Sequence, residues 1–217
     1  ATVANFGFSS LLPLLKLALL VYGAIFFFIF AVLGVVAKIC GFSIWTIIKI
    51  LKDELILAYS TASSETVLPR IMEKMEAYGA PKPVTSFVIP LGYSFNLDGS
   101  MIYMSFAVLF IAQAYNIDLS ISQQILMLLT LMITSKGIAG VSRASLVVIA
   151  ATLSMFKLPE AGLLLILAVD HFLDMGRTAT NIIGNSVATA VIAKTTKLDE
   201  EELPSPIVVD APQSEKL

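Results

Sequence analysis

Six polar residues share one face of an otherwise apolar helix near the end of this 217-residue chain. The helix is expected over residues 161–193, and successive residues of an α-helix are rotated by about 100°. The six side chains therefore fall within an arc of roughly 100°, and we call them the polar stripe: Asp170, Asp174, Arg177, Thr178, Asn181 and Asn185. Ionisable groups in lipid cost several kcal/mol unless they face a protein interior or an aqueous cavity. The polar stripe must therefore line a site, most simply a binding site for a small charged solute.

The composition is typical of a membrane protein. Hydrophobic residues make up 57% of the chain and charged residues 14%, and the mean hydropathy is +0.88, far from the averages of soluble proteins. The net charge of −2 and the lack of a basic patch exclude a nucleic-acid surface. Cys40 is the only cysteine, so the sequence contains no disulfide pair and no cysteine cluster for a metal. Because the chain begins with Ala1 and lacks a cleavable signal pattern, we expect a fragment of a longer protein.

Three apolar segments are long enough to cross a bilayer, which needs about 20 helical residues. They are residues 11–37, 87–114 and 161–193. The second segment carries Asn-Leu-Asp-Gly-Ser at its middle, over residues 96–100. Asp98 beside Gly99 predicts an unwound helix whose free backbone groups need partners, such as a bound cation. The alternative, that Asp98 only breaks the helix and binds no cation, stays open.

Two pairs of shorter helices predict re-entrant hairpins. In the first pair, amphipathic residues 43–59 and a helix from Pro69 to Tyr78 flank a polar tip over residues 61–66. In the second pair, residues 124–134 and 145–156 flank a glycine-bearing tip. No arm of either pair is convincing as a full span.

The basic residues predict opposite orientations for the two hairpins. Six of them separate the first and second spans, namely Lys38, Lys49, Lys52, Arg70, Lys74 and Lys82, whereas residues 113–124 contain none. The first hairpin is then expected to enter from the cytoplasm and the second from outside, with a cytoplasmic C-terminus. Each hairpin precedes a helix with a polar middle, which is the inverted repeat used by secondary transporters. We therefore expect an all-α membrane protein with transmembrane helices and two re-entrant helical hairpins in an inverted repeat. Residues 1–198 would form the membrane part and residues 199–217 an acidic disordered tail.

Four motifs occur in an order and spacing that resemble the dicarboxylate/amino acid:cation symporter family, the glutamate transporters. They are TASSETVLP, NLDGS, SKGIAG and DMGRTATNIIGN. The resemblance covers almost the whole chain up to Leu198 and implies the C-terminal half of such a protein, with helix 6, hairpin 1, helix 7, hairpin 2 and helix 8. It also implies a symporter without a cofactor, not an enzyme, that forms a homotrimer in a bacterial inner (plasma) membrane.

The resemblance implies a substrate site for glutamate or aspartate. Arg177 matches the guanidinium that grips the side-chain carboxylate of the substrate, and its planar fork suits bidentate binding. Asp174 matches the acid that receives the α-ammonium, and Thr178 lies beside this pair. The matches to the α-carboxylate site are Asn181, Ser63, Ser64 and the backbone of Gly140 and Val141.

The resemblance also implies a cation site coupled to H⁺, with Na⁺ as a further candidate ion at Asn96 and Asp98. The other matches are the backbone carbonyls of Gly92, Ser94, Ser135, Lys136 and Ile138 and the side chains of Asn181 and Asn185. Sodium-coupled relatives have an aspartate where this chain has Asn185, and a neutral amide offers a cation only a dipole. This departure favours proton coupling.

Other positions also depart from the family pattern. Ser142 and Arg143 stand where a Pro-Gly pair is common, which changes the charge of hairpin 2. Met104 stands where some proton-coupled relatives have a glutamate, so that proton carrier is missing. Asp170 is either part of the site or only orients its neighbours through an ion pair. His171, about 100° away on the helix, is expected to be a packed or lipid-edge residue and not the proton carrier.

Rival classes of membrane protein fit less well. An intramembrane aspartyl protease needs a shared proton between two acids, but Arg177 would hold Asp174 as a permanent anion. A channel would not need two occluding hairpins. A C4-dicarboxylate symporter of the same family is the open alternative, although its substrate has no ammonium for Asp174. We expect a symporter that imports glutamate or aspartate with H⁺ by alternating access.

Overall fold

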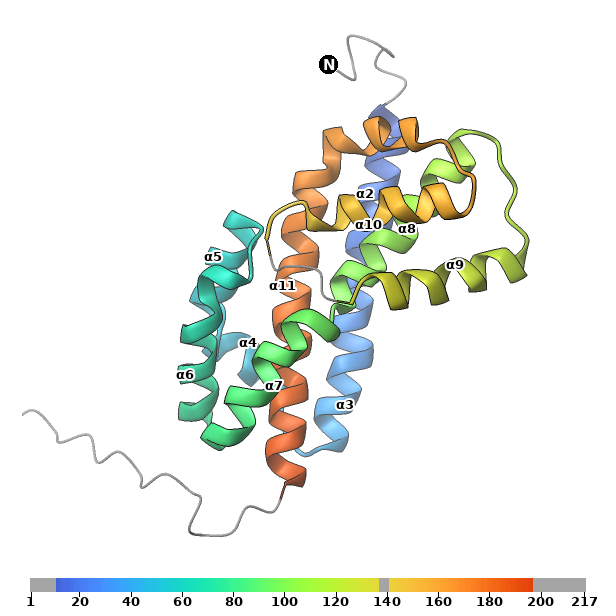
Figure 1. Ribbon diagram of the computed structural model, residues 1–217. Helices are drawn as coiled ribbons and strands as arrows, with labels where there is room; N and C mark the ends of the chain where they lie inside the picture. Colours follow the sequence, from blue (N-terminus) through green and yellow to red (C-terminus); the bar gives the residue numbers. More distant parts are fainter. Residues whose placement is uncertain (1–10, 137–140, 197–217) are drawn as a thin grey trace, which may run out of the picture.

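The computed structural model describes residues 11–136 and 141–196, and within these ranges the chain is helical and contains no strand (Figure 1). In chain order the elements are α2 (Leu11–Phe27), the π-helical turn η2 (Phe28–Leu33), α3 (Gly34–Ile39), α4 (Ile44–Ile50), α5 (Lys52–Thr61), the 3₁₀ turn η3 (Glu65–Val67), α6 (Leu68–Tyr78), α7 (Lys82–Phe95), α8 (Asp98–Ala114), α9 (Ile121–Thr134), α10 (Ala144–Met155), the 3₁₀ turn η4 (Glu160–Gly162) and α11 (Leu163–Thr195). The prediction of an all-α protein is confirmed. The tail predicted over residues 199–217 lies outside the described residues.

Helix α11 is the axis of the structure and contacts α2, α5, α7 and α8 (Figure 1). Its Ser and Thr hydroxyls donate to carbonyls one turn earlier, as in the 2.8 Å hydrogen bonds from Thr180 to Gly176 and from Ser186 to Ile182. Such bonds satisfy polar groups inside an apolar environment without a partner on another helix. A helix rich in Thr, Ser and Asn can therefore stay buried along most of its length.

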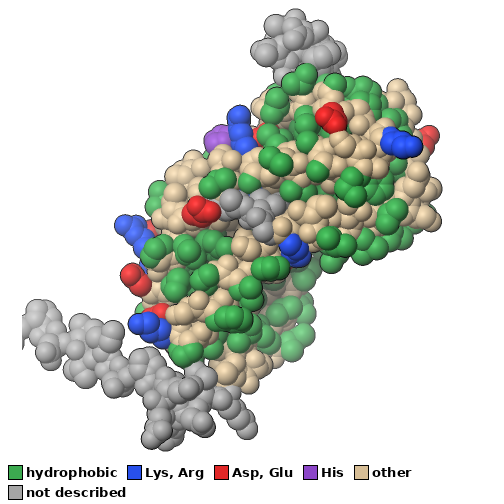
Figure 2. All heavy atoms as spheres, in the orientation of Figure 1, with side chains coloured by type: hydrophobic (Ala, Val, Ile, Leu, Met, Phe, Trp, Pro, Cys, Tyr) green, Lys and Arg blue, Asp and Glu red, His purple; other side chains and the backbone are tan. Residues whose placement is uncertain are grey.

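The first span forms one continuous helical path through α2, η2 and α3. It contacts α11 through Tyr22, whose hydroxyl donates to the carbonyl of Phe172 at 2.7 Å. Among the described residues, two helical segments are long and apolar enough to cross a membrane by length and composition, Leu12–Ile39 and Lys82–Ala114. Large apolar side chains of α2 and α9 are exposed, among them Leu19, Phe27 and Ile133, and Figure 2 shows hydrophobic side chains across the drawn face with few charges between them. Such a surface suits contact with lipid or a partner.

The helix predicted over residues 87–114 is interrupted, as expected, at Asn96 and Leu97 between α7 and α8. Its predicted start was wrong, because α7 begins at Lys82. Pro83 lies in the first turn of α7, where a missing N–H removes no intrahelical hydrogen bond. Lys82 and Pro83 therefore belong to the start of α7 and do not lie in a loop before it.

The first helix pair comprises α5 and α6, which lie side by side (Figure 1) and share one buried apolar cluster. Lys74 of α6 contacts both α5 and α4, because its Nζ lies 2.5 Å from Glu54 of α5 and donates to the carbonyl of Ile50 of α4 at 2.9 Å. The single helix predicted over residues 43–59 is kinked at Leu51, which is fully buried in the same cluster.

The second helix pair comprises α9 and α10. Helix α9 begins three residues before the predicted start because Ser120 and Gln123 form a capping box, in which the Ser120 N–H donates to Gln123 at 2.8 Å. Helix α10 follows Arg143, whose φ of 64° lies in the left-handed region. The predicted tip over residues 135–144 lies partly outside the described residues.

We predict that Gly99→Ala destabilises the protein. A Cβ at this position would lie 2.4 Å from the backbone carbonyl oxygen of Arg177, so α8 would have to move away from α11 at a cost of about 1–3 kcal/mol. The melting temperature of the purified protein in detergent would report this loss.

Gly23→Ala is the matched control, because a Cβ at Gly23 has nothing within 4 Å and lies inside α2. Helix propensity should make this change neutral or stabilising by about 0.5–1 kcal/mol. Equal effects of the two substitutions would contradict close packing of α8 on α11.

Candidate substrate and cation site

The polar stripe of α11 is buried along its whole length. Its six side chains are at most 4% exposed, and Asp170 and Asp174 are fully buried. The helix thus presents two carboxylates, one guanidinium and two amides to the protein interior. Buried charges are stable only when they are paired and hydrogen-bonded, so the partners of each one define the site.

The guanidinium of Arg177 contacts three elements. Its Nε pairs with Asp174 one turn earlier on α11. One terminal nitrogen donates to Ser100 Oγ of α8 at 3.0 Å, and the other donates to the carbonyl oxygen of Val141, before α10, at 3.3 Å. Arg177 therefore ties α8 and the second helix pair to α11.

The carboxylate of Asp174 faces the start of α10. Its Oδ2 accepts a hydrogen bond from the backbone N–H of Arg143 at 2.7 Å and one from Ser142 Oγ at 3.3 Å, and its Oδ1 accepts from Arg177. Charge-assisted hydrogen bonds of this kind offset the desolvation of a buried carboxylate. Thr178, as expected, lies beside the pair, and its hydroxyl donates to the carbonyl of Asp174 at 2.8 Å.

Asn181 joins α11 to the first turn of α8. Its Oδ1 accepts from the backbone N–H groups of Gly99 at 2.8 Å and Ser100 at 3.2 Å, and its Nδ2 donates to Ser100 Oγ at 2.9 Å. The first N–H groups of a helix have no intrahelical acceptor. Asn181 therefore caps α8 from a neighbouring helix and holds Ser100 against Arg177.

Three predicted cation ligands meet at the break between α7 and α8. Asn96 Nδ2 donates to Asn185 Oδ1 at 3.0 Å and to Asp98 Oδ2 at 3.2 Å. The packing is close, since a Cβ on Gly184 would lie 2.2 Å from Asp98 and one on Gly92 would lie 2.4 Å from Asn185. Asn185 Nδ2 is buried without a hydrogen-bond partner among the described residues. The break is thus a compact cluster of one carboxylate and two amides.

The remaining predicted ligands lie on the two helix pairs. Ser64 is buried between α5 and η3, and Ser63 is half-buried beside it. In the described part of the chain, no side-chain hydrogen bond joins Ser64 to the polar stripe. Ser94 lies half-buried in the last turn of α7, and Ser135 is buried at the end of α9, where its hydroxyl donates to the carbonyl of Met132 at 3.3 Å.

Two of the proposed backbone ligands, Ile138 and Gly140, lie outside the described residues. Lys136 is expected to offer its backbone carbonyl to a cation, and the structure shows in addition a contact of its side chain. Its Nζ donates to the carbonyl oxygen of Phe95, the last residue of α7, at 2.5 Å. The second helix pair thus brings an ammonium group to the break.

The sequence interpretation missed an ion-pair network at Asp170. Tyr103 of α8 donates to Asp170 Oδ1 at 2.5 Å, and Arg143 Nε lies 3.5 Å from Asp170 Oδ2. The sequence offered one signal for the first contact, because Tyr103 follows Ser100 by three residues and so shares its face of α8. It offered none for the second, since Arg143 precedes α10 and helical spacing does not relate it to Asp170 of α11.

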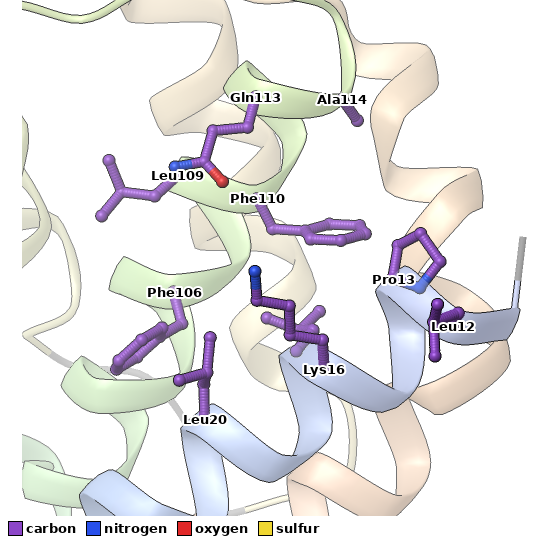
Figure 3. A pocket seen from close by; sticks show the side chains of 10 residues that line it. Leu12, Pro13, Lys16, Leu20, Phe106, Leu109, Phe110, Gln113 and Ala114 are labelled. Atoms are coloured by element: carbon purple, nitrogen blue, oxygen red, sulfur yellow. The ribbon is translucent and has the colours of Figure 1, made fainter.

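An apolar cavity of about 640 Å³ lies between the first half of α2 and the second half of α8 (Figure 3). Lys16 and Gln113 are the polar side chains that line it, among apolar ones such as Phe106 and Phe110 (Figure 3). It shares no residue with the polar stripe. A charged solute needs the partners that the polar stripe supplies, so we assign the site to the stripe and not to this cavity.

Comparison with known proteins identifies the family. The chain matches the sodium:dicarboxylate symporter family over residues 1–195. The chain belongs to this family. The resemblance seen in the four motifs is confirmed, and membership places the chain in a membrane transporter.

Similar proteins include several symporters. The chain is 66% identical over 193 residues to the proton/glutamate-aspartate symporter of Escherichia coli (strain K12), covering 89% of this chain and 44% of that protein. It is 63% identical over 193 residues to the proton/sodium-glutamate symport protein of Bacillus caldotenax, covering 89% and 46%. It is 50% identical over 194 residues to the C4-dicarboxylate transport protein of Bacillus subtilis (strain 168), again covering 89% and 46%. The chain therefore spans about half the length of the curated relatives it matches.

We predict that Arg143 and Asp170 stabilise the folded protein as a pair. Arg143→Gln should lower the free energy of unfolding by about 1–2 kcal/mol, because the buried Asp170 loses its ion pair, although the half-exposed arginine limits the loss. Glutamine is preferred to glycine for this test because glycine would also relieve the positive φ of residue 143.

A double-mutant cycle with Asp170→Asn, followed by denaturant unfolding in detergent, measures the coupling. The double variant should lose about 1 kcal/mol less than the sum of the single losses. Additive losses would show that the two side chains do not interact.

Proposed function

We propose that this chain is the C-terminal half of a symporter that imports glutamate or aspartate together with H⁺ by alternating access. The observation that carries the proposal is the unused hydrogen-bonding capacity of the Arg177–Asp174 pair. A guanidinium has five N–H donors, and Arg177 uses three of them with described residues. Two donors remain, the number that a bidentate carboxylate needs.

Asp174 has a matching capacity for an ammonium. A carboxylate offers about four acceptor sites, and donors from Arg177, Ser142 and Arg143 occupy three of those on Asp174. A ligand with a carboxylate and an ammonium group therefore suits the pair better than a neutral solute. The proton/glutamate-aspartate symporter of E. coli, at 66% identity, supports this substrate class.

A C4-dicarboxylate symporter is the alternative, supported by the 50% identical transport protein of B. subtilis. Its substrate would use the two free donors of Arg177 in the same way. It has no ammonium for the remaining acceptor site of Asp174, so it would leave a buried carboxylate with less compensation. The fully buried Asp174 therefore favours an amino acid.

The proposal includes the membrane arrangement expected from the sequence. The helices of the two pairs contain 10 to 14 residues each, too few to cross a bilayer of roughly 30 Å. This length supports two re-entrant hairpins, in an inverted repeat with the broken α7–α8 segment and α11. The basic residues before α8 support entry of the first hairpin from the cytoplasm. We further propose a homotrimer in the bacterial inner membrane, with residues 1–198 as half of the transport domain and residues 199–217 as a disordered cytoplasmic tail.

We predict that Asp174→Ser and Arg177→Cys affect different parts of the substrate. Asp174→Ser should weaken glutamate and aspartate far more than succinate, because only the amino acids carry an ammonium. Arg177→Cys should weaken all three by about 1.5–3 kcal/mol or more, because each loses its charge-assisted partner. Competition against radiolabelled glutamate or succinate, with the complete transporter in liposomes, gives these affinities.

The two outcomes separate the candidate substrates. Equal losses for amino acids and succinate in Asp174→Ser would mean that the acid serves the helix and not the ligand, and the dicarboxylate alternative would then be preferred. Unchanged glutamate affinity in Arg177→Cys would show that Arg177 does not bind the carboxylate of the substrate.

We also predict that a proton gradient alone drives uptake. Asn185 offers a dipole where a carboxylate would offset the lost hydration of Na⁺, so the region around Asn185 should hold no tight sodium site, and any residual effect of Na⁺ would come from Asp98. Liposomes that contain the complete transporter should accumulate glutamate in sodium-free buffer with an inward proton gradient. Accumulation only with a sodium gradient at symmetrical pH would refute proton coupling.

A further inference from the structure

We propose that the side-chain ammonium of Lys136 is a built-in cation at the break between α7 and α8, taking the role that a bound Na⁺ would have there. The inference rests on the proposed symport function and deepens it, because it names the source of positive charge at the cation site. It differs from the expectation that Lys136 offers its backbone carbonyl to a bound ion.

The first step concerns the end of α7. The last carbonyl groups of a helix have no intrahelical donor, and they carry partial negative charge. Phe95 ends α7, and its carbonyl oxygen accepts a hydrogen bond from Lys136 Nζ at 2.5 Å. The Lys136 ammonium is therefore hydrogen-bonded to the last carbonyl oxygen of α7, one residue after the expected ligand Ser94.

The second step concerns the net charge at the break. Asp98 is the carboxylate of the Asn96–Asn185 cluster, and the Lys136 ammonium is bound beside it at Phe95, the residue before Asn96. With one negative and one positive group, the cluster has no net negative charge. A monovalent cation in a site of low dielectric constant needs such a charge to offset its lost hydration.

The third step concerns the oxygen atoms themselves. Asp98 Oδ2 and Asn185 Oδ1 both accept from Asn96 Nδ2, and Phe95 O accepts from Lys136. Three oxygens that could ligate Na⁺ at the break are therefore already hydrogen-bonded to N–H donors. Sodium at the Phe95 carbonyl would compete with an ammonium that is covalently tethered to the chain just after α9.

An ordinary structural lysine gives a different expectation. A cation at a helix C-terminus contributes about 0.3–1 kcal/mol through the helix dipole and involves no particular ion. Lys194 is an example in this chain, since its Nζ donates to the carbonyls of Gly41 at 2.8 Å and Cys40 at 3.2 Å, just after α3. Lys194→Met is thus a matched control, because it also removes an ammonium from carbonyl oxygens but at a distance from the break.

The experiment measures glutamate binding and binding of radioactive sodium by the complete transporter in detergent, in sodium chloride and in choline chloride. Wild type, Lys136→Arg and Lys194→Met should bind glutamate equally in both salts and show no saturable sodium binding. Lys136→Met should bind glutamate about tenfold more weakly in choline, equivalent to about 1.4 kcal/mol. Sodium should restore its affinity, and saturable sodium binding should appear.

Two results would overturn the inference. The first is that Lys136→Met binds glutamate with the same affinity as Lys194→Met in both salts. The second is that Lys136→Met loses glutamate affinity in choline and sodium does not restore it. Lys136→Gln, which keeps a polar side chain without charge, replaces Lys136→Met if that variant does not fold, and the same outcomes apply to it. Wild-type protein that binds no acidic amino acid in either salt would refute the proposed function. The sodium-binding measurement needs no substrate, so it would still decide the role of Lys136.

Discussion

The buried ion pair between Arg177 and Asp174 is the interaction on which the arrangement of the site depends. Burying two charges costs more than their mutual attraction returns unless further hydrogen bonds satisfy them. Here Ser100 of α8 and residues 141–143 before α10 supply those bonds. Helix α8 and the second helix pair must therefore take fixed positions around α11 for the pair to be stable. These partners leave two N–H donors of Arg177 and one acceptor site of Asp174 unused. The unused groups allow the pair to bind a charged ligand.

Glycine residues make this convergence sterically feasible. Gly99 faces the backbone of Arg177, and Gly184 faces the carboxylate of Asp98, with space for no Cβ at either position. Small residues allow helices in membranes to approach closely, and the close approach shortens polar contacts that would otherwise be weak. The glycines next to polar ligands in the sequence thus have a packing role, since they let α8 lie directly against α11.

The features that could be predicted from the sequence are those set by local periodicity and by helix-breaking residues. The polar stripe is visible because Asp174, Arg177 and Asn181 recur at helical spacing, and the break between α7 and α8 is visible because Asp98 and Gly99 interrupt an apolar run. Contacts between elements could not be read in this way. The ion pair of Arg143 with Asp170 joins a residue of left-handed backbone conformation, just before α10, to α11, and family patterns with glycine at that position give no reason to expect a guanidinium there.

The positive charges of the second helix pair give it a different mode of attachment from the first. Apolar side chains such as Met127, Leu131 and Ile149 pack its two helices into the main core, but its inner end is held by Lys136 on the α7 carbonyl and by Arg143 on Asp170. Both contacts join an exposed cation to an anionic group or a carbonyl. A cation at the surface can exchange its partner for water at modest cost, and so can the carbonyl of the exposed Phe95, whereas the buried Asp170 cannot. Displacement of this end is therefore opposed mainly by the loss of the ion pair between Arg143 and the buried Asp170 of α11.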